Sequence, residues 1–277
     1  MTILTWEDAP QAVLADFVHL TEVQLRSKAE VEHGVFVAES EKIINRALQA
    51  GLTPRAALLQ EKHLDTLTPL IKQYPKVPIV LGTSEQLAAV TGYNVHRGAL
   101  ATFNRPRPAE ITPLLQNAKT VVVLDQLVDH ANVGAIFRAA AGLGADAVLL
   151  TEGCADPLYR RAIKVSMGSV FNVAWAHLPR WEEAGPLLRK MGFTLAGLAL
   201  RENAVDLLEF ASNPPEKVAF LLGSEGPGLS RKALGASDVL VKIPMQNGVD
   251  SLNVAHAASL SLWSLRAVSQ LNQSQSG

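Results

Sequence analysis

The sequence lacks most of the features that would place a protein in a membrane or in an oxidising compartment. Its 277 residues include a single cysteine, Cys154, which excludes an internal disulfide and a zinc site built from cysteines. No apolar run approaches the length that spans a bilayer, and the first residues carry acids where a secretory signal carries basic residues. A cytoplasmic location without membrane contact is therefore expected, with Cys154 as a core or surface thiol rather than a nucleophile.

An excess of positive charge is also missing. The formal net charge is −1, and Lys+Arg and Asp+Glu number 11 and 11 as far as Pro108, then 14 and 15. Because phosphate contacts dominate affinity for nucleic acid, such a partner would require basic residues that gather in space rather than in the sequence. Hydrophobic content of 48% and charged content of 18% are those of an ordinary globular protein, and the length suits one large or two smaller domains.

Two common nucleotide-binding signatures are absent. No Gly-x-x-x-x-Gly-Lys-Ser/Thr occurs, which argues against a phosphate-cradling NTPase. No Gly-x-Gly-x-x-Gly follows the first strand of the C-terminal half, which argues against a dinucleotide-dependent dehydrogenase. A Gly-x-x-Gly-x-Gly run stands only late in the chain, at 223–228, where by itself it says little.

The N-terminal part alternates short strands and helices. A helical period over residues 8–32 precedes expected strands at 35–38, 55–59, 77–81 and within 92–103, with helices from Ser40 to the glycine at 51 and over 83–91. The stretch 105–113, RPRPAEITP, contains three prolines and is the expected linker.

After this linker the alternation is stronger. Apolar strands are expected at 121–124, 147–150, 173–176, 193–198 and 218–222, separated by helices such as 132–143, 157–167 and 181–191. Continuous apolar strands between helices predict a parallel sheet that is covered on both faces. Ligands bind at the carboxyl ends of such strands, where the polar loops after Leu124, Leu222 and Ile243 are expected to lie.

Two of these loops carry the residue types of a binding site. Glycines in LLGSEGPGLS, residues 221–230, indicate positive φ or a close backbone approach to a ligand. The loop in IPMQNGVDSLN, residues 243–253, delivers Asp250, Ser251 and Asn253 to the start of an apolar helix. Either loop alone is also compatible with a tight turn in a core, but two in tandem favour one shared pocket.

Three motifs occur in a fixed order along the C-terminal half. They are an Asn followed by Gly and, six positions after the Asn, by Arg; then Gly-Ser-Glu-Gly-x-Gly; then Ile-Pro-Met leading to Ser-Leu-Asn-Val. Their residues are Asn132, Gly134 and Arg138; Gly223, Ser224, Glu225, Gly226 and Gly228; and Ile243, Pro244, Met245, Ser251, Leu252, Asn253 and Val254. Together they resemble the SpoU/TrmH-type RNA ribose 2′-O-methyltransferases of the SPOUT superfamily.

The resemblance implies an α/β architecture in two parts. Residues 107–277 would form a SPOUT methyltransferase domain, whose parallel sheet is covered by helices and ends in a C-terminal trefoil knot. Residues 1–106 would form an N-terminal helix and a smaller L30e-like RNA substrate-binding domain, on the looser match of FVAESEKIINRALQAG and GYNVHRGALATF. S-adenosylmethionine would bind in the knot, and the enzyme would act as a homodimer through the catalytic domain.

The resemblance also implies roles for individual residues. The cofactor would bind among Leu222, Gly223, Ile243, Met245 and Leu252, and the catalytic group would comprise Arg138, Asn132, Glu225, Ser251 and Asn253. A guanidinium normally stays protonated, so an arginine is better suited to orient a phosphate or stabilise a developing alkoxide than to act as a base. The alternative role of the Asn, Glu and Ser side chains is to cap helices and stabilise turns.

Contacts with RNA are expected from Arg160, Arg161 and Lys164, although such a local cluster can equally be a solvated face. Two departures from the family pattern stand out: Asp129-His130-Ala131 replaces Asp-Pro-Gly, which affects the turn before Asn132, and Glu39-Ser40 replaces Glu-Gly. The predicted activity is S-adenosylmethionine-dependent methylation of a ribose 2′-hydroxyl in rRNA or tRNA. A non-catalytic RNA-binding or ribosome-assembly protein that retains the knot, and methylation of another acceptor such as a tRNA base nitrogen, are the alternatives.

Overall fold

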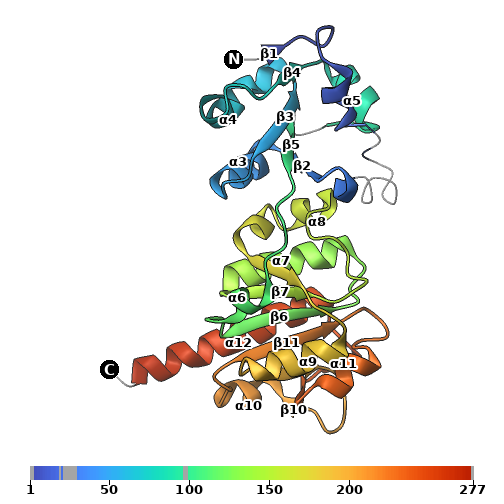
Figure 1. The fold of residues 1–277 in the computed structure, drawn as a ribbon. Coiled ribbons are helices and arrows are strands. Elements are labelled where there is room, and N and C mark those ends of the chain that lie inside the picture. The colour runs from blue at the N-terminus through green and yellow to red at the C-terminus, as the bar shows by residue number, and fades with distance from the viewer. Residues whose placement is uncertain (1–2, 19, 21–29, 96–98, 276–277) are drawn as a thin grey trace. The chain divides into compact units, whose positions relative to one another are not determined.

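The structure, a computed structural model, describes residues 3–18, 20, 30–95 and 99–275. The chain divides into two compact units, each with its own sheet (Figure 1). The N-terminal unit comprises residues 1–107 and 158–171, and the C-terminal unit comprises residues 108–157 and 172–277. Residues 158–171 fall within the range 107–277 that was expected to form one domain, but they belong to the N-terminal unit.

The N-terminal unit is built on a mixed five-stranded sheet. Its strands lie in the order β1 (Ile3–Leu4), β4 (Ile79–Leu81), β3 (Pro54–Leu59), β5 (Ala99–Asn104) and β2 (Val35–Glu39). The first three are parallel, and β5 is antiparallel to both β3 and β2. The helices are α1 (Gln11–Ala15), α3 (Glu41–Gln49), η1 (Glu61–Leu67), α4 (Thr68–Gln73), α5 (Ser84–Thr91), α8 (Arg160–Val165) and most of η2 (Ser169–Asn172).

Local sequence accounts for most of these elements. Strand β2 is buried throughout, as its apolar run predicts. Helix α5 begins with a capping box, in which Thr83 and Gln86 bond each other's backbone, and ends at Gly92 with φ 80°. The helical period over 8–32 corresponds, among the described residues, to the five-residue α1 and to helical residues 30–32, while 19 and 21–29 lie outside them.

The C-terminal unit contains a seven-stranded sheet in which every pair is parallel. This confirms the parallel sheet that the apolar strands predict. The strands lie in the order β10 (Val205–Asp206), β12 (Val239–Lys242), β9 (Thr194–Leu198), β11 (Val218–Gly223), β6 (Thr120–Asp125), β7 (Ala147–Leu150) and β8 (Ala174–His177). In the centre of the sheet, β6 and β11 are in register from Thr120 opposite Val218 to Asp125 opposite Gly223.

Helices cover both faces of this sheet. They are α6 (Ile111–Leu115), α7 (His130–Leu143), α9 (Trp181–Lys190), α10 (Leu207–Ser212), α11 (Arg231–Ala236) and the long α12 (Val254–Gln275), drawn in red in Figure 1. Leu115, Leu188 and Ala233 from α6, α9 and α11 join one core cluster with the inward residues of β6, β7, β9 and β11. Helix α12 packs against α7, α10 and β11.

The proline-rich stretch 105–113 does not stay irregular throughout, because α6 begins at Ile111. None of the helices in the described part of the chain combines the length and apolarity that a membrane crossing requires.

Candidate active site

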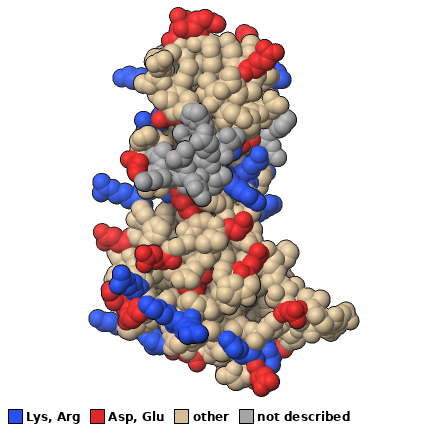
Figure 2. Space-filling view, turned by 90° about the vertical axis from the view of Figure 1, so that its right-hand side faces the viewer, with Lys and Arg blue, Asp and Glu red and all other residues tan. Residues whose placement is uncertain are grey.

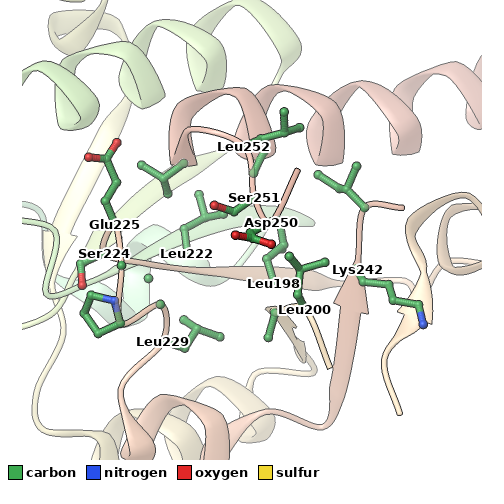
Figure 3. A pocket seen from close by; sticks show the side chains of 18 of the residues that line it. Leu198, Leu200, Leu222, Ser224, Glu225, Leu229, Lys242, Asp250, Ser251 and Leu252 are labelled. Carbon is green, nitrogen blue, oxygen red and sulfur yellow. The ribbon is translucent and has the colours of Figure 1, made fainter. Parts of the chain in front are cut away.

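A cavity of about 700 Å³ lies where β9, β11 and β12 end (Figure 3). Its walls come from residues 198–201, 222–229 and 241–254 and from helices α11 and α12. The five residues expected to bind a cofactor all line it: Leu222, Gly223, Ile243, Met245 and Leu252. The tertiary structure therefore brings the glycine-rich loop and the polar loop together at one cavity, as the parallel topology of the sheet predicts.

The first wall is the glycine loop, defined here as residues 223–230. Ser224 and Gly228 close it, since the backbone N–H of each donates to the carbonyl of the other at 3.1 and 2.9 Å. Gly226 and Gly228 have φ values of 86° and 69°, as the sequence predicts for these positions. At Gly223 the reason is different: an added β-carbon would lie 2.1 Å from the carbonyl carbon of Gly228. Gly223 is thus required by its own loop and not by a positive φ.

Three side chains from distant segments form the Asn–Glu–Asn network, which consists of Asn132, Glu225 and Asn253. Asn132 Nδ2 donates to Glu225 Oε1 at 2.9 Å, and Asn253 Nδ2 donates to the same oxygen at 2.8 Å. Asn253 Nδ2 also lies 2.9 Å from Asn132 Oδ1, which accepts from it. In Figure 3 the Glu225 side chain points away from the middle of the cavity. One carboxylate therefore ties the starts of α7 and α12 to the glycine loop.

Helix capping supports the same network. The side chain of Asp129 accepts from the backbone N–H of Asn132 at 2.8 Å, and α7 begins at His130. His130 occupies the first helical position, where proline is common, so its replacement of the family's proline leaves the helix start intact. Asn253 Oδ1 accepts from Ala255 N at 2.9 Å. The Asn253 side chain therefore caps α12 through its oxygen and joins the Asn–Glu–Asn network through its nitrogen, so the two roles do not exclude each other.

The remaining two residues of the expected catalytic group lie apart from this network. Ser251 lines the cavity and is exposed. Arg138 is exposed on α7 and is not among the residues that line the cavity. Six positions turn an α-helix by about 600°, which sets Arg138 about 120° around α7 from Asn132. The fold of one chain thus leaves the arginine outside the cavity.

The cluster expected to contact RNA lies in the N-terminal unit and is partly neutralised. Glu39, only 4% exposed, accepts from Arg160 Nη1 at 3.4 Å and from Lys164 Nζ at 3.3 Å. The Arg160 guanidinium also lies 4.4 Å from the centre of the Tyr93 ring, and the Tyr93 hydroxyl donates to Glu39. Burial raises the pKa of Tyr93, so its hydroxyl remains a donor. Of the three cations, only Arg161 has no contact with Glu39 and is exposed.

The surface charge agrees with the balanced composition. On the face shown in Figure 2, acidic side chains lie among the basic ones, and no continuous basic surface covers the visible described residues. Within the described ranges, His, Cys, Asp and Glu side chains form no group that could hold a metal ion. Burial raises the pKa of the Cys154 thiol, which fits a thiol without a nucleophilic role.

One buried acid, at the end of the first strand of the C-terminal unit, was not among the expected site residues. Asp125 is 1% exposed and accepts from Trp181 Nε1 at 2.9 Å and from Ser230 N at 2.7 Å. A charged residue that ends a fully apolar strand was the available signal, but its partners lie 56 and 105 residues away.

Solved structures share this fold over nearly the whole chain. An S-adenosylmethionine-bound rRNA methyltransferase from Sinorhizobium meliloti superposes with a TM-score of 0.79, at 23% identity over 96% of this chain and 97% of the other. An RNA 2′-O ribose methyltransferase superposes with a TM-score of 0.73, at 26% identity over 97% and 100%.

Sequence comparison gives relatives of the same kind. An uncharacterised tRNA/rRNA methyltransferase of Mycobacterium bovis is 38% identical over 251 residues, which cover 90% of this chain and 87% of the relative. The 23S rRNA (guanosine(2553)-2′-O)-methyltransferase RlmP of Bacillus subtilis is 26% identical over 249 residues, or 86% and 91%. The profile of the SpoU rRNA Methylase family matches residues 119–263. The chain therefore belongs to the SpoU rRNA Methylase family.

Proposed function

We propose that the protein transfers a methyl group from S-adenosylmethionine to a ribose 2′-hydroxyl of a structured RNA, either rRNA or tRNA, in the cytoplasm. The observation that carries this proposal is the cavity between the glycine loop and residues 243–253, with the Asn–Glu–Asn network joined to its wall. The relative RlmP, named as an rRNA 2′-O-methyltransferase, supports the choice of acceptor. The proposal includes a C-terminal trefoil knot around this cavity and an L30e-like N-terminal domain that binds the substrate.

The cavity suits the cofactor in size and lining. Ligand sites commonly enclose about 300–1,000 Å³ and combine apolar walls with a few polar groups. Here Leu198, Leu222 and Leu252 supply apolar surface for an adenine ring, while the backbone of residues 243–253 supplies polar groups for its edge. When bound, S-adenosylmethionine supplies an electrophilic methyl group on a sulfonium. The two loops would hold that methyl in line with the ribose oxygen, and such alignment provides much of the rate.

The acceptor side of the reaction requires a cation. Arg138 would orient an RNA phosphate or stabilise the alkoxide as the ribose hydroxyl loses its proton, because its guanidinium stays charged. Within its own chain Arg138 does not line the cavity. Its role therefore requires RNA, or a second copy of the chain, to complete the site.

A second copy is expected against α12. Leu260 and Trp263 are 40% and 50% exposed and stand three positions apart on this helix, so they share one face. Large apolar side chains that share an exposed helix face are typical of an interface. We place the homodimer contact there, in the C-terminal unit. Sedimentation of the wild-type protein and of Trp263→Asp measures the oligomeric state of each. A Trp263→Asp variant that remains a dimer would refute this placement.

The proposed RNA contact involves fewer residues than the three cations that the sequence indicates. Arg160 and Lys164 both bond Glu39, so they serve first to hold α8 against β2. Arg161 carries the proposed phosphate contact, with Lys164 as a neighbour that is itself 48% exposed.

The decisive test is labelled methyl transfer from S-adenosylmethionine to total RNA from a strain that lacks this protein, followed by mapping of the modified nucleotide. Modification of a ribose supports the proposal. Modification of a base nitrogen would assign another acceptor, and cofactor binding without transfer to any RNA would favour a non-catalytic RNA-binding protein. Glu225→Ala, which removes the shared acceptor of the network, is the matched inactive control.

A further inference from the structure

A buried carboxylate that takes no part in the proposed reaction is bonded to the last residue of the glycine loop. Asp125 is the last residue of β6, is 1% exposed and does not line the cavity. One of its oxygens, Oδ2, accepts from the backbone N–H of Ser230 at 2.7 Å. The other, Oδ1, accepts from the indole Nε1 of Trp181 on α9 at 2.9 Å.

The two ends of the glycine loop are thereby attached to one residue. Gly223 begins the loop and stands opposite Asp125 in the register of β11 and β6. Ser230 ends the loop and donates its backbone N–H to the Asp125 side chain. Between these ends, Ser224 and Gly228 close the turn on each other. The loop is thus held at both ends by a residue that does not itself line the cavity.

The chemistry of the anchor favours a fixed loop. A buried carboxylate is tolerated only when hydrogen bonds replace its lost hydration, and bonds to an ionised acceptor are shorter and stronger than neutral ones. Asp125 has two such donors, the indole N–H of Trp181 on α9 and the backbone N–H of Ser230 at the end of the glycine loop. A loop that is ordered before a ligand arrives loses less conformational entropy on binding, which raises affinity.

We propose that Asp125 is a positioning residue for S-adenosylmethionine, which fixes the glycine loop in its binding conformation through the Ser230 amide. The proposal rests on the proposed function, since it takes this cavity as the cofactor site. It assigns Asp125 no contact with the cofactor or the RNA.

A proline substitution removes the bond in question, and its ring carbon takes the place of the amide hydrogen that faces Asp125 Oδ2. Ser230 has φ −60°, which proline adopts, so Ser230→Pro removes the N–H that Asp125 accepts without forcing a new φ at this position. Proline also removes the Ser230 hydroxyl, which accepts from Ala233 N at 3.1 Å. Ser230→Ala removes that hydroxyl but keeps the N–H, and is therefore the matched control.

The measurements are the Kd of S-adenosylmethionine by calorimetry and the rate of methyl transfer, both on the full chain. We expect Ser230→Pro to weaken cofactor binding about tenfold or more relative to Ser230→Ala, as for the loss of a hydrogen bond to a charged group. At saturating cofactor the transfer rate should stay within about threefold, because the anchor acts on binding alone. When Asp125→Asn is also present, the difference in Kd between Ser230→Pro and Ser230→Ala should shrink, because Asp125→Asn and Ser230→Pro disrupt the same interaction.

Equal Kd values for folded Ser230→Pro and Ser230→Ala would overturn the proposal. If the proline variant does not fold, Asp125→Asn decides, and a Kd within about twofold of wild type would be the overturning result. If the wild-type chain binds no S-adenosylmethionine, the proposed function fails instead. Hydrogen exchange of the Ser230 amide then tests the anchor alone: protection that is lost in Asp125→Asn supports it, and unchanged protection refutes it.

Discussion

Asn253 Nδ2 donates a hydrogen bond to Asn132 Oδ1 at 2.9 Å, although the two residues stand 121 positions apart in the chain. Both also donate to Glu225 Oε1, so the starts of α7 and α12 and the glycine loop form one hydrogen-bonded unit. A residue can therefore be connected to the cavity without lining it. Asn132 is buried and does not line the cavity, but it is bonded to Glu225 and Asn253, which do.

Asn132→Ala should impair methyl transfer more than cofactor binding. The change removes one donor from Glu225 and one acceptor from Asn253, while the cavity walls remain. We expect the transfer rate to fall about 10–100-fold, in line with one or two hydrogen bonds that involve a charged group, and the Kd of S-adenosylmethionine to change less than about threefold. Labelled transfer and calorimetry measure the two effects. Asn213→Ala, an exposed asparagine that ends α10, is the control and should leave both unchanged.

Arg138→Ala should abolish methylation while cofactor affinity changes little, because Arg138 lies outside the cavity. Arg138→Lys keeps the charge but not the planar fork of donors, and should recover only part of the rate. Calorimetry with S-adenosylmethionine and single-turnover transfer separate binding from chemistry. A loss of cofactor affinity as large as that of Gly223→Ala would contradict this division of roles.

Gly223→Ala should weaken cofactor binding strongly. Its β-carbon would lie 2.1 and 2.2 Å from backbone atoms of Gly228 and Leu229, so the glycine loop must shift. We expect at least a tenfold rise in the Kd of S-adenosylmethionine and a lower thermal midpoint, as is usual when extra volume is forced into a packed site. Gly142→Ala on α7 is the matched control, since nothing lies within 4 Å of its added β-carbon. It should raise stability by up to about 1 kcal/mol through helix propensity.

Ser40→Gly should stabilise the protein. Ser40 has φ 87° and ψ 147°, a conformation that glycine adopts far more readily than serine, which explains why the family pattern has glycine here. Its buried hydroxyl also has no hydrogen-bond partner among the residues that the structure describes. Removal of the backbone strain and of the unpaired hydroxyl should outweigh the greater freedom of glycine in the unfolded chain. The free energy of unfolding should rise by roughly 1–2 kcal/mol. Denaturant unfolding measures this change, and an unchanged or lower free energy of unfolding would show that Ser40 is not strained.

Arg161→Ala and Arg160→Ala should have different effects. Removal of Arg161 should weaken RNA binding and lower the slope of log Kobs against log salt by about one, as for one lost phosphate contact. Removal of Arg160 leaves buried Glu39 one cation short and should lower the free energy of unfolding by roughly 1–3 kcal/mol. Salt-titrated RNA binding and thermal unfolding measure these changes. An unchanged salt slope in Arg161→Ala would remove this residue from the RNA contact.

The sequence by itself determined strands β6, β7, β8, β9 and β11 and helices α7, α9 and α12 of the C-terminal unit. The strand expected at 121–124 is β6, Thr120–Asp125, and the one expected at 218–222 is β11, Val218–Gly223. Such elements follow from apolar period, caps and glycines, all of which act within a few residues. The collection of the polar loops at one edge of the sheet followed as well, because parallel strands end on the same side.

Only the tertiary structure decided which polar groups meet. Glu225 accepts hydrogen bonds from Asn132 and Asn253. Asp125 accepts them from Trp181 and Ser230. Glu39 pairs with two of the cations that were expected to contact RNA. The three carboxylates find partners 28 to 125 positions away in the chain. Charge and spacing along the sequence cannot indicate such pairings, because they depend on which strand ends and helix starts the sheet order brings together.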